Sequence, residues 1–195
     1  RDRADGLVFR SAPNVRVLRR AQRVAADVAP PDPRLLAAGV PASAAGALPN
    51  AEREARAAAA LFAPDAERPV PARLAAVLDA LGRCTVWHFA CHGCYDELSP
   101  LDSTLSLADG ELSARDLMTR ERGARRLAIL SACQTTAAAG LAPDEVVGFP
   151  SALLQAGVAG VVSCQAEVDD EEAMFVVLAF LRRVRDGSHP ARALA

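Results

Sequence analysis

Short buried strands alternate with helices along most of this chain, and this alternation limits its fold more than any other feature. Residues 84–90 and 126–131 are short runs of apolar, aromatic and β-branched side chains, which is typical of buried strands. Between such runs, apolar residues recur at helical spacing, as they do at Leu74, Val77 and Leu81. The alternation predicts an α/β fold with three layers, in which helices cover both faces of a mostly parallel sheet joined by right-handed crossovers.

The individual elements follow from apolar spacing and from capping residues. Asn14, Asn50 and Ser113 are expected to cap helices, and Glu52 and Glu54 suit the positive end of the second of these. The Asp-Gly pair at 109–110 predicts a small β-hairpin over 105–112. The expected helices are 14–27, 50–62, 71–82, 113–123 and 171–184, with further helical segments that open at Asp144 or Pro150 and stop at Gly157. The expected strands are 35–40, 84–90, 126–131 and 158–163.

Composition excludes several classes of protein. The 22 basic residues are scattered among 24 acidic ones and the net charge is -2, so neither nucleic acid nor an anionic membrane is an expected partner. Five cysteines without a disulfide pattern predict reduced thiols in a cytoplasmic protein, and no apolar run reaches the ~18 residues of a membrane span. A length of 195 residues predicts one domain, with an N-terminal helix and linker over 1–33 and a core over 34–195. The two ends suggest a fragment of a longer chain.

Two reactive side chains follow the ends of predicted strands. His92 comes two residues after the strand 84–90, and Cys133 comes two residues after the strand 126–131. If these strands are neighbours, ~4.8 Å apart, both side chains converge on the carboxyl edge of the sheet, where chemistry collects in such folds. A thiol of pKa ~8.5 needs a nearby imidazole to become a thiolate at neutral pH, and the N–H groups of Gly93 and Cys133 could hold an oxyanion. The pattern predicts nucleophilic catalysis by Cys133 with His92 as its base.

Several motifs in a fixed order carry a family resemblance. They are W-H-F-A-C-H-G at 87–93, L-S-L-A-D-G-E-L-S-A-R-D-L at 105–117, L-S-A-C-Q-T at 130–135, D-E-V-V-G-F-P-S-A-L-L-Q-A-G-V-A-G-V-V at 144–162, V-D-D at 168–170 and, more loosely, L-P-N-A-E-R-E-A at 48–55. Together they resemble the CHAT domain, a caspase-related family that is often attached to tetratricopeptide repeats. The family usually has Ser-Leu-Trp where this chain has Ser163, Cys164 and Gln165.

The resemblance implies a caspase-haemoglobinase fold and hydrolysis of peptide bonds through an acyl-enzyme. It places the catalytic pair on His92 and Cys133 and the oxyanion donors on Gly93 and Cys133. The implied partners are a protein or peptide substrate and a regulatory domain, such as tetratricopeptide repeats, in the same or another chain; no cofactor and no metal are implied. Position after predicted strands or beside motifs adds five expected substrate contacts: Asp102, Ser103, Ser131, Glu145 and Asp169.

Two alternatives remain open at this point. The first is a module of the same fold that has lost hydrolysis and acts by interaction or regulation. The second is a zinc-stabilised module, because His88, Cys91, His92 and Cys94 are closely spaced and Cys84 lies nearby. Strand alternation argues against zinc, since it places His88 and Cys91 on opposite faces. His88 is instead expected to be a hydrogen-bonded internal histidine without a chemical role, and His189 an exposed loop residue.

Overall fold

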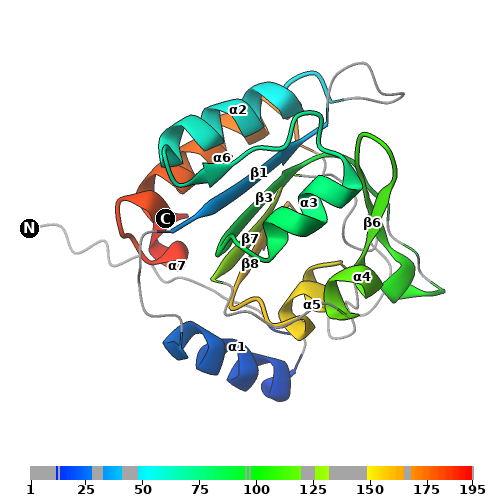
Figure 1. The fold of residues 1–195 in the computed structure, drawn as a ribbon. Coiled ribbons are helices and arrows are strands. Elements are labelled where there is room, and N and C mark those ends of the chain that lie inside the picture. The colour runs from blue at the N-terminus through cyan, green and yellow to red at the C-terminus, as the bar shows by residue number, and fades with distance from the viewer. Residues whose placement is uncertain are drawn as a thin grey trace, which may run out of the picture.

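The central feature of the computed structural model is a five-stranded parallel sheet with strand order β2-β1-β3-β7-β8 (Figure 1). The structure describes residues 12, 14–27, 33–40, 48–94, 96, 98–119, 126–131, 149–164 and 168–194. The strands are β1 (Leu35–Gly39), β2 (Ala66–Glu67), β3 (Val86–Ala90), β7 (Leu127–Ser131) and β8 (Val161–Ser163). The sheet is parallel throughout. The predicted α/β fold is therefore confirmed.

Helices cover both faces of this sheet, as Figure 1 shows. One face packs against α2 (Ala51–Phe62), α6 (Asp170–Arg185) and α7 (Pro190–Ala193), and the other against α3 (Leu74–Leu81), α4 (Ala114–Thr119) and α5 (Phe149–Gln155). Alternate residues of each strand point to opposite faces, so the sheet separates two apolar cores. Helix α1 (Val15–Asp27) lies beside α5. These layers give the α/β/α arrangement of a caspase-like fold.

A small antiparallel sheet adjoins the carboxyl edge of β3. Its strands are β4 (Gly93–Cys94), β5 (Thr104–Ser106) and β6 (Glu111–Ser113), in that spatial order. The predicted hairpin is confirmed as the β5–β6 pair, with the amide of Leu107 donating to the carbonyl of Gly110 at 2.8 Å. A short 3₁₀ turn, η1 (Pro100–Asp102), precedes β5. Because β4 begins three residues after β3 ends, the small sheet fixes the chain where it leaves the central sheet.

Several boundaries differ from those that the sequence predicts. The helix predicted to start at residue 71 begins at Leu74, whose amide donates to the Asp109 carboxylate at 2.7 Å, so a residue of a distant turn starts this helix. The short elements β2, β4 and α7 were not predicted, because two to four residues leave no periodic pattern. The end of the helix predicted over 113–123 and the opening predicted at Asp144 lie outside the described residues. Among the helices that the structure describes, none is both long and apolar enough to span a bilayer.

Candidate active site

Strands β3 and β7 are hydrogen-bonded neighbours, as the sequence argument required. Their register pairs Ala90 with Ser131, so both strands end at the same level of the sheet. His92 lies two residues beyond Ala90, and Cys133 lies two residues beyond Ser131. Cys133 and the expected substrate contact Glu145 lie outside the described residues. The predicted neighbourhood of the two strands is confirmed, whereas the contact between His92 and Cys133 stays a prediction.

The backbone of His92 is held while its side chain is exposed. Its carbonyl accepts a hydrogen bond from the amide of Ser106 at 2.8 Å, which ties it to β5. The next residue, Gly93, starts β4 and pairs with Leu105. The preceding residue, Cys91, is buried. The imidazole of His92 is thus available at the carboxyl edge of the sheet, on a backbone that two flanking contacts position.

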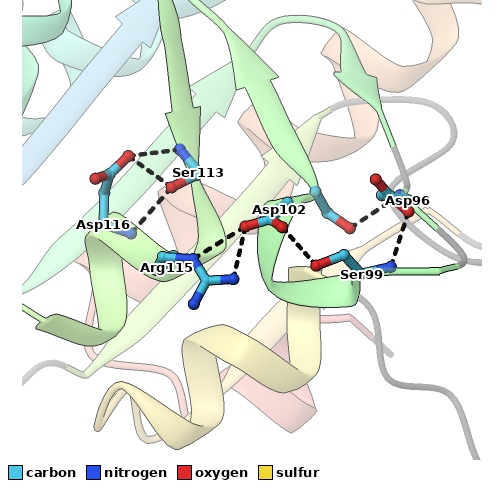
Figure 2. A network of polar contacts seen from close by, with 7 residues as sticks. Asp96, Ser99, Asp102, Ser113, Arg115 and Asp116 are labelled. Carbon is cyan, nitrogen blue, oxygen red and sulfur yellow. Dashed lines mark hydrogen bonds and ion pairs between the residues drawn. The ribbon is translucent and has the colours of Figure 1, made fainter.

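A network of polar contacts joins the described residues between β4 and β5 to one another and to α4 (Figure 2). The Asp102 carboxylate accepts hydrogen bonds from the Ser99 hydroxyl at 2.5 Å and from Arg115 Nη2 at 2.8 Å. The hydrogen bond from Ser99, followed by that from Arg115, lowers the pKa of Asp102 below its usual value. The amide of Asp96 donates to the Ser103 hydroxyl at 3.1 Å. Asp102 and Ser103, both expected to contact substrate, therefore already have partners within this loop.

Asp169 has a structural role at the start of α6. Its carboxylate accepts hydrogen bonds from the amides of Glu171 at 2.9 Å and Glu172 at 3.3 Å, so it caps the helix. The neighbouring Asp170 carboxylate accepts from the amide of Asn50 at 2.8 Å and joins the starts of α6 and α2. A substrate contact by Asp169 stays a prediction, because the cap uses one carboxylate oxygen, Oδ1, and leaves the side chain exposed.

Sequence reasoning missed a buried polar group directly below this edge. Glu54 of α2 lies against His88 of β3, with 2.7 Å between Glu54 Oε1 and His88 Nε2, and its Oε2 accepts from the Ser131 hydroxyl of β7 at 3.1 Å. All three side chains are buried, with exposures of 1%, 0% and 8%. Glu54 is thus a core residue of α2 and does not serve as an exposed acidic residue near the helix start. Ser131 is likewise turned into the core.

The signal for a buried Glu54 is present in the sequence. The buried residues of α2 form one stripe at helical spacing, and Glu54 lies within it: Ala51, Glu54, Ala55, Ala58 and Phe62. Every other member of the stripe is apolar. A charged residue in such a stripe indicates a buried partner, because a buried carboxylate without one is very costly.

The described cysteines differ sharply in environment. Burial, together with the nearby Glu54 carboxylate, raises the pKa of Cys91 to about 12. Burial also raises the pKa of Cys84 to about 11. Cys94 is exposed and Cys164 is half-buried. A raised pKa leaves almost no thiolate at neutral pH, so neither Cys84 nor Cys91 has the character of a nucleophile.

The residues of the zinc alternative point in different directions. His88 faces the α2 side of the sheet, and Cys91 belongs to the core on the α3 side. His92 and Cys94 are exposed. Within the described ranges, no group of three or more His, Cys, Asp or Glu side chains is placed to hold a metal ion. The expected histidine at 88 is internal and hydrogen-bonded, as predicted.

Comparison with known proteins gives one positive result. The chain matches the family described as CHAT domain over residues 6–195. No curated protein matches the chain. The match spans nearly the whole sequence, including the strands that precede His92 and Cys133.

Proposed function

We propose that this chain, which belongs to the CHAT domain family, is a cysteine endopeptidase that uses Cys133 as nucleophile and His92 as base. CHAT domains form a caspase-like family, and the parallel sheet with helices on both faces agrees with that fold. The observation that carries the proposal is the register of β3 and β7, which pairs Ala90, two residues before His92, with Ser131, two residues before Cys133. Two adjacent parallel strands that end at one level are what a dyad at this edge needs.

The proposed reaction has two stages. His92 accepts the proton of the Cys133 thiol, and the thiolate attacks the carbonyl carbon of the peptide bond. The amides of Gly93 and Cys133 stabilise the oxyanion, and His92 protonates the leaving amine as the C–N bond breaks and the acyl-enzyme forms. His92 then deprotonates a water molecule, which attacks the thioester and releases the carboxylate product and the free thiol. Neither stage needs a cofactor.

The proposed substrate is a protein or peptide in the cytoplasm. We further propose that other domains or partners, such as tetratricopeptide repeats, control access to the site. Contacts of substrate with Asp102, Ser103, Ser131, Glu145 and Asp169 stay predictions.

Labelling of Cys133 by a thiol-directed peptide electrophile tests the dyad. The exposed Cys94 would compete for the reagent, so the experiment uses a Cys94→Ser background. We expect Cys133 to be labelled, and we expect His92→Ala to slow labelling by about 100-fold or more, because a base of this kind contributes about that much. His189→Ala is the matched control, since His189 is also exposed but caps α7.

Equal labelling rates in the parent and the His92→Ala variant would contradict the dyad. A second measurement, made on the full-length protein, distinguishes an active peptidase from an interaction module of the same fold that has lost hydrolysis. Wild-type protein should cut members of a peptide library that Cys133→Ala leaves intact. Labelling of Cys133 without any such cleavage would favour the silent module.

A further inference from the structure

We propose that Glu54 is a positioning residue for the dyad, because its carboxylate joins the two strands from which His92 and Cys133 extend. One carboxylate oxygen is bonded to His88 of β3 and the other to Ser131 of β7. The inference rests on the proposed function, since it assigns Glu54 a role in the geometry of that site. Through Glu54, helix α2 joins strands β3 and β7 as an element that shapes the proposed site at the carboxyl edge of the central sheet.

The register shows how Glu54 spans the sheet. His88 pairs with Ile129, and Ala90 pairs with Ser131, so Glu54 bridges the diagonal from His88 to Ser131 across β3 and β7. His88 lies four residues before His92, and Ser131 lies two residues before Cys133. A change in the position of either strand end relative to the other would therefore lengthen one of the two bonds to Glu54.

Directional bonds fix position in a way that the surrounding core does not. The neighbours on this face are apolar side chains such as Ala55, Ala58 and Ile129. Apolar contacts are non-directional and tolerate small shifts, whereas a buried carboxylate must keep its hydrogen bonds or bear the cost of an unpaired charge. The group therefore favours one arrangement of β3 and β7 over nearby ones.

The other ring nitrogen of His88, Nδ1, indicates which nitrogen of the imidazole carries the proton. Within the described part of the chain, His88 Nδ1 is buried without a hydrogen-bond partner. A proton on Nδ1 would be an unsatisfied buried donor, so we assign the proton to Nε2, where it is donated to Glu54. The pair is then a neutral imidazole and a carboxylate.

Replacement of Glu54 by Met removes the bridge with little change in side-chain length. Gln is unsuitable, because it keeps both contacts when its oxygen faces His88 Nε2–H and its NH₂ group faces the Ser131 oxygen. The thioether of Met is at best a weak acceptor, so His88 Nε2–H and the Ser131 hydroxyl both lose their partner. Ser131→Ala disturbs the β7 side and leaves the His88 bond in place.

The test measures how fast Cys133 reacts with iodoacetamide across a range of pH, again in the Cys94→Ser background. Reaction rate reports the thiolate of Cys133 and hence its geometry with His92. We expect Glu54→Met and Ser131→Ala each to slow the reaction at neutral pH by about 10-fold or more and to move its pH profile upward. Because both act on one bridge, the double variant should be little slower than Glu54→Met alone.

Glu52→Gln is the matched control, because Glu52 is on the same helix but pairs with Arg56 at the surface. It should keep the parent's rate and pH profile. Circular dichroism and thermal melting show whether each variant is folded. A purely structural role would lower the melting temperature and leave the profile of the folded protein unchanged, and this result would overturn the proposal. If Glu54→Met does not fold, Ser131→Ala alone decides between the two roles by the same measurements.

The two proposals fail differently. Labelling of Cys133 that depends on His92 but is unaffected by the Glu54 and Ser131 substitutions overturns only the positioning role. Labelling of Cys133 that does not depend on His92 overturns the proposed dyad, and the role of Glu54 with it.

Discussion

Residues close together near the carboxyl edge of the central sheet differ greatly in how far their side chains are exposed to solvent. Cys91 and His92 are adjacent in sequence, yet one is buried and the other exposed. Cys94 is exposed as well. Only the thiolate reacts with alkylating reagents, so burial and a raised pKa protect a cysteine together.

Alkylation of the native protein at pH 8 tests this difference. With a pKa of about 12, Cys91 has about one thiolate in ten thousand molecules at that pH. We expect iodoacetamide to modify Cys94 at least about 100-fold faster than Cys91 or Cys84, as measured by mass spectrometry of peptides. In denaturant all three should react alike. Equal rates for Cys91 and Cys94 in the folded protein would contradict the burial of Cys91.

Residue roles were only partly predictable from the sequence. The positions of His92 and Cys133 after neighbouring strands could be inferred, because strand ends and chemistry-bearing residues are local features. The partnership of Glu54, His88 and Ser131 could not, because it joins residues up to 77 positions apart and depends on where α2 packs. Glu54 also lies near a helix start, where an exposed acidic residue is the ordinary expectation.

At the scale of elements, capping residues marked helix starts well. The Asn14 side chain accepts from the amide of Val17 at 3.0 Å. The amide of Asp116 donates to the Ser113 hydroxyl and the amide of Ser113 donates to the Asp116 carboxylate, as in a capping box. Asn50 precedes α2 as predicted, but its side chain does not cap that helix and accepts from Arg53 instead. The local sequence therefore predicts where these helices start. Tertiary contacts determine which atoms hydrogen-bond to the free backbone groups at the helix ends.

Helix α2 packs so closely on β1 that one methyl group added at Gly39 tests the contact. A Cβ atom at Gly39 would lie 2.5 Å from the Ala51 carbonyl oxygen and 2.7 Å from the Ala55 Cβ. Backbone cannot move aside cheaply, so we expect Gly39→Ala to lower the free energy of unfolding by about 1–3 kcal/mol, as measured by urea denaturation.

Gly82 is the control for this substitution. It follows α3 with helical dihedral angles, and a Cβ atom there would come no closer than 3.7 Å to any other group. We expect Gly82→Ala to leave stability unchanged or to raise it by up to about 1 kcal/mol. A Gly39→Ala variant as stable as Gly82→Ala would show that α2 and β1 are not packed this closely.

For the whole molecule, the strand order predicts a gradient of stability across the sheet. Strands β3 and β7 each pair on both sides, whereas β2 and β8 are the outer strands. We expect the amides of residues 86–90 and 127–131 to exchange with deuterium most slowly, and those of 66–67 much faster. Native-state exchange followed by mass spectrometry measures this. Comparable rates in β2 and β3 would contradict the central position of β3.

The overall architecture was more predictable than its details. Four of the five central strands and the layered arrangement follow from periodicity, because the hydrophobic pattern of each element reflects which faces it buries. The order of the strands does not follow from periodicity. That order depends on long-range pairing, and it places β1 between β2 and β3 although residues 35–40 are only a short apolar run.

The outer strands of the central sheet also affect whether copies of this chain associate through their sheet edges. An outer strand offers unpaired backbone donors and acceptors, to which a strand of another molecule can add. Here β2 has two residues and β8 has three, whereas the strands they flank have five. A strand of another molecule would form few backbone hydrogen bonds with either outer strand. Short outer strands therefore work against aggregation of the folded chain, and within the described residues they leave the five-residue strands enclosed between neighbours.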